Sequence, residues 1–150
     1  MTNPIFETTT TIKKPIDEVF EFFSKAENLE ILTPEWLNFK IKSKLPIDMQ
    51  QGTKIDYVIR LLGIPMKWKT DITMWQPPDK FQDTQIKGPY KVWIHTHSFE
   101  DHDDYIIMTD HVEYRSKGWI LAPFIEKLFV RPRIEKIFAY RKKKMDLLFN

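Results

Sequence analysis

The sequence predicts a single α+β domain over residues 1–150, in which a curved antiparallel sheet of about seven strands wraps around a long C-terminal helix. Three observations lead to this prediction. Residues 5–12 and 38–115 alternate apolar and polar side chains as strands do, and short turn signals divide the longer range. Residues 118–150 repeat apolar side chains at helical spacing. Strands joined by short turns pair antiparallel, and the helix must lay its apolar face on their sheet.

The N-terminal segment predicts a strand followed by two short helices. Ile5–Ile12 is rich in threonine and bounded by prolines, which favours a strand. Pro15 suits the first turn of a helix. The apolar residues that share one face of this helix are Val19, Phe20 and Phe23. A second helical stretch, Asn28–Leu32, ends before Pro34, because a residue that precedes proline disfavours the helical conformation.

The middle of the chain predicts a meander. The expected strands are 39–42, 54–62, 66–75, 81–87, 90–100 and 105–115, separated by turn signals such as Gly63-Ile64-Pro65 and Pro77-Pro78-Asp79. In the strand at 66–75, strict alternation places Trp68, Ile72 and Met74 on one face. In the C-terminal helix, Pro132 lacks an amide hydrogen and is expected to kink the helix or divide it in two.

The composition excludes several classes of function. The chain has 23 basic and 21 acidic residues, a balance that gives no reason to expect a nucleic-acid partner. It has no cysteine, which excludes disulfides and thiolate chemistry. No phosphate-binding loop or common hydrolase motif is present, and we expect no cofactor. Without a signal-peptide pattern or an apolar run of the ~20 residues that span a bilayer, we expect a cytoplasmic protein.

Four segments carry a resemblance to a known family. Pro15-Ile16-Asp17-Glu18-Val19-Phe20 matches a Pro-x-x-x-Val-Phe start of the first helix, and residues 28–36 continue in a similar way. With residues 88–99 and 109–114, the chain resembles an uncharacterised bacterial branch of the START-like (SRPBCC) superfamily, which includes Bet v 1-type proteins and polyketide cyclase/dehydrases. The resemblance implies a helix-grip fold with a ligand cavity between the sheet and the C-terminal helix. Members of this branch occur alone or beside an epimerase-like partner protein.

Two histidines are the first candidates for chemistry. His95 and His97 are two residues apart on an expected strand, so both face the same side of the sheet. Paired histidines can ligate a metal, but Glu100 lies on the opposite face by strand parity. A catalytic zinc site needs a third protein ligand, and the local sequence offers none, so we expect no metal.

Asp110 lies on the next expected strand and shares a face with Tyr114. If Asp110 points inward, this carboxylate needs a partner, for which a pocket histidine, Arg131 and Arg141 are the candidates. Three roles stay open for such a network: structural support, orientation of a ligand, and general acid–base catalysis. The candidates for catalysis are His95, His97, Asp110 and Tyr114.

The favoured function is binding or transport of a small hydrophobic ligand, such as a lipid, a quinone or a polyketide-like compound, without catalysis. The expected ligand-binding residues are Tyr57, Ile59, Trp68, Ile72, Trp93, His95, His97, Phe99, Asp110, Phe124, Leu128 and Arg131. Two alternatives stay open: a cyclase/dehydratase that uses the pocket His, Asp and Tyr residues, and a regulatory interaction module without a ligand. The basic run Arg141–Lys144 forms a solvated face or makes a transient contact with a membrane surface.

Overall fold

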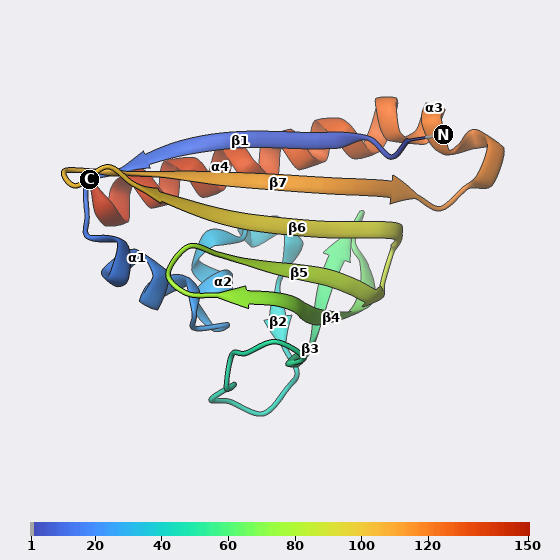
Figure 1. The fold of residues 1–150 in the computed structure, drawn as a ribbon. Coiled ribbons are helices and arrows are strands. Elements are labelled where there is room, and N and C mark those ends of the chain that lie inside the picture. Colours follow the sequence, from blue (N-terminus) through green and yellow to red (C-terminus); the bar gives the residue numbers. More distant parts are fainter. Residues whose placement is uncertain (1) are drawn as a thin grey trace.

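The computed structural model describes residues 2–150 and shows one seven-stranded antiparallel sheet, in the order β1-β7-β6-β5-β4-β3-β2 (Figure 1). The strands are β1 (Ile5–Ile12), β2 (Lys40–Ile41), β3 (Lys54–Leu61), β4 (Ile64–Gln76), β5 (Lys80–Lys87), β6 (Tyr90–Asp101) and β7 (Ile106–Ser116). From β2 to β6, each strand pairs with the strand that follows it in the chain. The first strand pairs with the last and forms one edge of the sheet. The predicted α+β meander is confirmed.

Helices lie before and after the meander. The short ones are α1 (Ile16–Phe23), α2 (Asn28–Leu32) and the 3-10 turns η1 (Glu35–Leu37) and η2 (Trp119–Leu121). The C-terminal helix is built from α3 (Ala122–Ile125), a π-helical turn η3 (Glu126–Val130) and α4 (Arg131–Phe149). Pro132 lies just after the π-helical turn η3, a wider winding that accommodates its missing amide hydrogen, and the chain continues from η3 into α4 as one coil (Figure 1). The expected division at Pro132 therefore takes the form of a change in helical winding.

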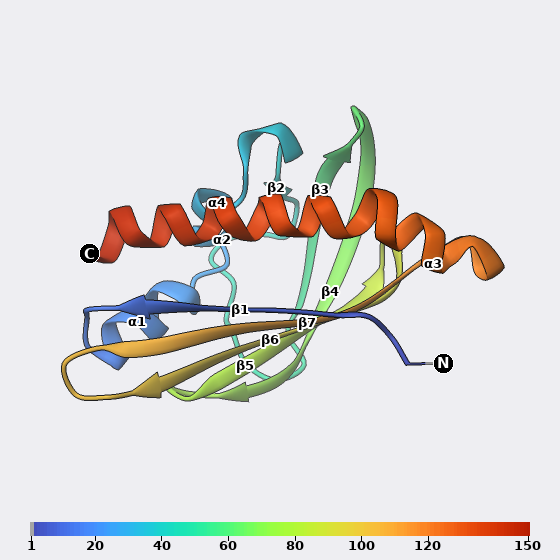
Figure 2. The same cartoon turned by 90° about the horizontal axis from the view of Figure 1, so that it is seen from above.

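The sheet curves around α4. Figure 2 shows α4 running along one face of the sheet, beside β1 and β7, while β3 and β4 bend up toward it. One stripe of α4 is buried and consists of Ile134, Phe138, Arg141, Met145 and Phe149. Their spacing of three or four residues keeps them on the face that meets the sheet. This is the helix-grip arrangement that the sequence predicts.

The inward face of β4 changes partway along the strand. The pairing of β4 with β5 shifts register between Ile72 and Met74. Such a bulge adds a residue to one strand and reverses which side chains point inward beyond it. Trp75, rather than Met74, therefore packs on the core, with its ring 5.2 Å from that of Phe20. The expected inward position of Met74 was wrong because strict alternation assumes a strand without bulges.

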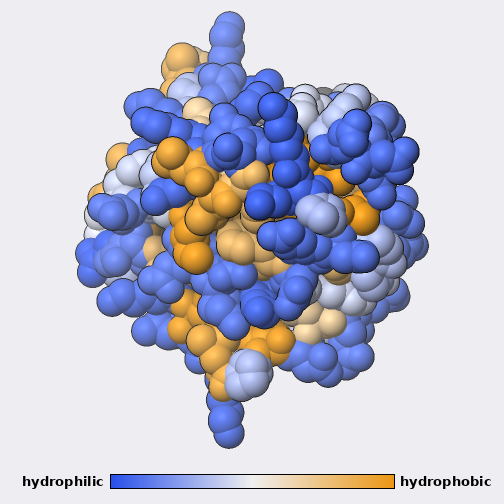
Figure 3. All heavy atoms as spheres, turned by 90° about the vertical axis from the view of Figure 1, so that its left-hand side faces the viewer, coloured by the Kyte–Doolittle hydropathy of each residue, from blue (hydrophilic) through white to orange (hydrophobic). Residues whose placement is uncertain are grey.

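Hydrophilic side chains cover most of the face that Figure 3 shows. Figure 3 views the end of the molecule that carries the C-terminus, where apolar side chains gather near the middle of the face and hydrophilic ones surround them. Within residues 2–150, none of the helices combines the length and the apolar character required to cross a bilayer.

Candidate functional site

A cavity of about 140 Å³ lies between the concave face of the sheet and α4. Seven of the expected ligand-binding residues line it: Tyr57, Ile59, Trp68, Ile72, Trp93, His95 and His97. The wall is completed by apolar side chains of the α1–α2 connection, α2, η1 and α4, among them Ala26, Leu29, Leu37, Ile137 and Phe138. The rings of Trp68 and Trp93 meet edge to face, 5.5 Å apart, and form one apolar end without filling the space.

Phe124 and Leu128 lie outside this cavity, with 62% and 49% of their surface exposed. The cause is the rotation of the helix about its own axis. Ala122 and Glu126, four residues apart, face inward, and Glu126 accepts hydrogen bonds from the backbone amide of Ser116 and from the Ser116 hydroxyl. Phe124 and Leu128 are each two residues away from this inward face and are therefore turned toward solvent. The expectation that these two side chains converge on the gap between sheet and helix does not match their positions.

Four other expected site residues lie around the cavity without lining it. Phe99 packs in the core beside Phe20, and Tyr114 lies in a second core cluster. Arg131 is 40% exposed and donates to the carbonyl oxygen of Ile5 at the outer end of the sheet, so it is not the partner of Asp110. Asp110 is itself buried, directly behind the two histidines.

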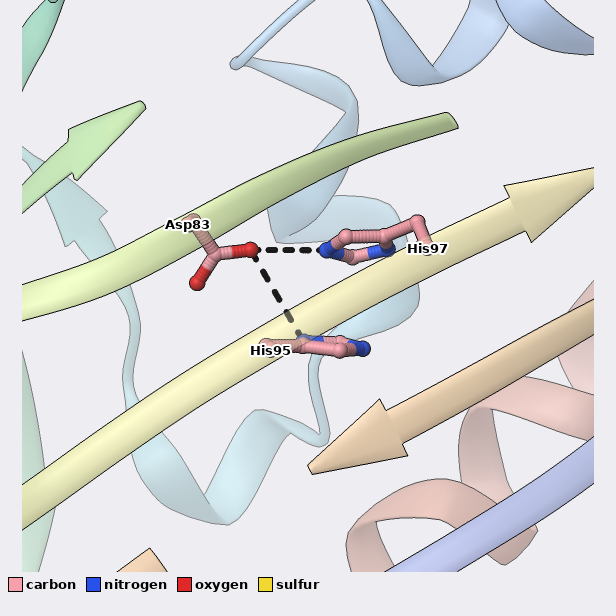
Figure 4. A group of neighbouring side chains, drawn as sticks. All are labelled: Asp83, His95 and His97. Atoms are coloured by element: carbon pink, nitrogen blue, oxygen red, sulfur yellow. Dashed lines mark hydrogen bonds and ion pairs between the residues drawn. The ribbon is translucent and has the colours of Figure 1, made fainter. Parts of the chain in front are cut away.

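The polar end of the cavity brings together five side chains from four elements. His95 Nε2 lies 2.7 Å from an oxygen of Asp110, and His97 Nε2 lies 2.7 Å from an oxygen of Asp83. Arg141, from the buried stripe of α4, donates to the same Asp110 oxygen at 3.4 Å. The two imidazole rings stack with centroids 3.7 Å apart, and both face Asp83 (Figure 4). We refer to these five residues as the polar cluster.

Sequence reasoning did not identify Asp83 as a site residue. Its strand, β5, pairs with β6 so that Asp83 lies opposite His95 and Phe81 opposite His97. Because Phe81 points into the core, strand parity sends Asp83 inward as well. The signal was therefore present in the sequence, in the two-residue spacing between an apolar core residue and a carboxylate. Arg141 was expected only as one of several partners for Asp110.

Burial and charge set the protonation states within the polar cluster. Burial alone raises the pKa of Asp110, but the Arg141 guanidinium and the hydrogen bond from His95 outweigh it and hold this pKa well below its usual range. Burial also raises the pKa of Asp83. The hydrogen bond from His97 and the nearby His95 and Arg141 side chains outweigh this effect and lower the pKa overall. Burial and the neighbouring His95 lower the pKa of His97 to about 4, against the raising effect of Asp83.

At neutral pH both carboxylates are therefore ionised, and His97 is neutral. An ionised carboxylate only accepts hydrogen bonds, so Nε2 of His97 carries the hydrogen and donates it to Asp83. This assignment leaves Nδ1 of His97 with a free lone pair. Within the described residues 2–150, that atom is one of the buried polar atoms without a hydrogen-bond partner, and so are Nε1 of Trp68 and Nε of Arg141. All three belong to residues that line the cavity.

The lowered pKa of His97 predicts a loss of stability in acid. The unfolded chain protonates this residue near pH 6.5, whereas the folded protein does so only near pH 4. The unfolded state therefore binds more protons in this window, and the free energy of unfolding falls by about 3 kcal/mol as the pH drops through it. The lowered pKa values of Asp83 and Asp110 extend the loss below pH 4. Urea denaturation between pH 7 and pH 4.5, in EDTA, measures this slope.

The matched variants are His97→Gln, which is expected to flatten the slope between pH 6.5 and 4.5, and His111→Gln. His111, half-exposed and paired with Glu7, does not line the cavity, and its variant serves as the comparison for the loss of a histidine outside the site. Equal slopes in the wild type and in His97→Gln would show that His97 is not held neutral by its surroundings. The ionisable groups that act on His97 are Asp83 on β5, His95 on β6 and Asp110 on β7, and Asp110 is in turn paired with Arg141 on α4.

An antiparallel sheet that grips a helix around a small, mostly apolar cavity defines a protein of the helix-grip class. The chain belongs to the polyketide cyclase/dehydrase and lipid-transport family, whose model matches residues 12–134. A comparison with curated proteins finds no match.

Solved structures support the same fold. Protein CV1439 from Chromobacterium violaceum aligns with a TM-score of 0.73 at 13% identity, over 97% of this chain and 97% of that one. Ginseng major latex-like protein 151 from Panax ginseng aligns with a TM-score of 0.68 at 11% identity, over 99% of each chain. A START superfamily protein from Mycobacterium smegmatis aligns with a TM-score of 0.67 at 11% identity, over 96% of this chain and 98% of that one. At these identities the similarity establishes the fold alone.

Proposed function

We propose that the protein binds a small, mainly apolar molecule that carries one polar group, in the cavity between the sheet and α4. The observation that carries this proposal is the composition of the cavity wall, which is apolar along most of its length and has the polar cluster at one side. Apolar walls with a few placed polar groups are typical of small-molecule sites. The unpartnered polar atoms of Trp68, His97 and Arg141 add to it, because buried polar groups normally have partners.

The volume narrows the range of ligands. The cavity measures about 140 Å³, close to the ~150 Å³ of an engineered apolar cavity that holds benzene or xenon, and below the ~300 Å³ of common ligand pockets. A molecule the size of a single aromatic ring fits the cavity in this shape. A quinone with a long tail or a lipid chain requires the wall to move apart.

Binding of p-cresol, a single ring with one hydroxyl group, tests the proposal. In a nitrogen–proton NMR titration, the indole signals of Trp68 and Trp93 are expected to shift, because both rings line the cavity. The signal of Trp119, which is 86% exposed, serves as an internal control and should stay in place. Toluene, which lacks the hydroxyl group, should bind about five-fold more weakly if the polar cluster hydrogen-bonds the ligand.

Two variants sharpen this test. Ile59→Phe adds bulk inside the cavity and is expected to abolish the shifts, whereas Ile64→Phe, at a position 60% exposed, should not. The proposal fails if p-cresol shifts no indole signal, or shifts only Trp119. In that case the regulatory module without a ligand becomes the favoured function.

A second candidate function is general acid–base catalysis in the same cavity, of the cyclase or dehydratase type. The observation that favours it is the neutral His97 in the cavity wall, which Asp83 orients through a hydrogen bond to Nε2. Tyr114, another of the catalytic candidates from the sequence, lies outside the cavity lining. Turnover of a β-hydroxy ketone that disappears in a folded His97→Gln variant would support catalysis, and its absence in the wild type would dismiss it.

The membrane contact and the epimerase-like partner stay predictions. Arg141, the first residue of the basic run, is buried in the polar cluster and is therefore not available for a membrane contact. The cations left for a membrane surface in this run are Lys142, Lys143 and Lys144. Two of these, Lys143 and Lys144, line a shallow groove beside Trp36 and Leu147.

A further inference from the structure

We propose that Asp83, His95 and His97 form a binding site for a divalent first-row transition-metal ion at the polar end of the cavity. One ligand atom from each residue lies within 4.8 Å of the other two. Two imidazoles and a carboxylate form a donor set suited to zinc, iron, cobalt or manganese. The sequence offered only the two histidines, and the pairing of β5 with β6 supplies the third donor.

Each of the two histidine rings has one nitrogen directed toward Asp83 and the other directed toward Asp110. On one side, Nδ1 of His95 and Nε2 of His97 lie 3.8 and 2.7 Å from the same oxygen of Asp83 (Figure 4). On the other side, Nε2 of His95 and Nδ1 of His97 lie 2.7 and 3.5 Å from the same oxygen of Asp110. Histidines that bind a metal commonly donate their second ring N–H to a carboxylate, which orients the ring. Asp110 is placed to orient both rings, with Asp83 as the carboxylate ligand.

This arrangement also explains the unpartnered nitrogen of His97. In the metal-free protein its hydrogen is on Nε2, bonded to Asp83, and Nδ1 has no partner within the described chain. A metal ion bound at Nε2 would replace the hydrogen there, and the neutral ring would carry its hydrogen on Nδ1 instead. The Nδ1–H group then faces the Asp110 oxygen 3.5 Å away, close enough for a small ring rotation to complete the hydrogen bond. Metal binding thus gives a partner to a polar atom in a side chain that is 1% exposed.

The charge of the polar cluster favours a cation. The polar cluster holds two carboxylates and one guanidinium, which leaves one negative charge when both imidazoles are neutral, at a site where Asp110 is 1% and Asp83 19% exposed. A buried charge without a counter-charge is costly. A divalent ion supplies the missing positive charge, and three protein ligands leave a coordination position for water or for a polar group in the cavity. The proposal is independent of the organic ligand, since the ion needs only the side chains.

Cobalt and zinc are the probes. Protein dialysed against EDTA and then titrated with Co²⁺ at pH 7.5, without any organic molecule, is expected to show visible absorption bands that saturate at about one equivalent. Zn²⁺ should displace the cobalt and abolish the bands. Asp83→Asn is expected to weaken binding about 100-fold, and Asp110→Asn, which alters only the orienting partner, about 10-fold to 100-fold.

His111→Gln is the matched control, since it removes a surface histidine that is also 2.7 Å from a carboxylate. It should leave binding unchanged. If a variant unfolds, proton NMR of the wild type alone tests the proposal. Bound Co²⁺ must shift the ring-proton signals of His95 and His97 and leave those of His102 and His111 in place. The proposal is overturned if the wild type takes up neither ion, if Asp83→Asn binds as tightly as the wild type, or if the paramagnetic shifts fall on His102 or His111.

Discussion

Replacing Arg141 by methionine is expected to lower the free energy of unfolding by about 3–5 kcal/mol at pH 7, because it leaves a buried carboxylate without its counter-charge. The Arg141 side chain is 7% exposed, Asp110 is 1% exposed, and their closest atoms are 3.4 Å apart. Methionine keeps most of the length and apolar surface of arginine, so the expected loss comes mainly from charge. Urea denaturation with intrinsic tryptophan fluorescence measures the change.

Two further variants separate the ion pair from general effects on α4. Lys143→Met removes an exposed cation from the same helix and should change the free energy of unfolding by less than about 0.5 kcal/mol. Adding Asp110→Asn to Arg141→Met should recover part of the loss, because the unpaired charge is then absent as well. A loss in Arg141→Met that equals that of Lys143→Met would mean that Asp110 does not depend on this guanidinium.

Replacing Phe20 by alanine is expected to lower the free energy of unfolding by about 3–5 kcal/mol, because it opens a cavity in the main core. The ring is 6% exposed and lies 5.2, 5.9 and 5.6 Å from the rings of Trp75, Phe81 and Phe99. It therefore links the first helix to β4, β5 and β6 behind the cavity. Thermal and urea unfolding both report the loss.

Phe124→Ala is the control with the same chemistry and a different position. Phe124 is 62% exposed, and its removal is expected to cost less than about 0.5 kcal/mol. The pair of variants also tests the outward rotation of the helix at α3. If Phe124→Ala destabilised the protein as much as Phe20→Ala, the inward position expected from the sequence would be the correct one.

The candidate site could be predicted in part from local patterns. That His95 and His97 share one face of the sheet follows from strand parity alone, and the apolar wall follows from the same rule applied to β3 and β4. Parity failed at Met74, where a bulge adds one residue, and helical spacing failed at Phe124, because an apolar residue on a helix does not show which way the helix is rotated.

By itself, the sequence determined the α+β class, the order of its elements, and which faces of the strands are apolar, because alternation and helical spacing are local properties of the chain. Only the tertiary structure decided that Asp83 from β5 and Arg141 from α4 meet the two histidines at one end of a cavity of about 140 Å³. Strand register and helix rotation bring these residues together, and both depend on how the whole core packs.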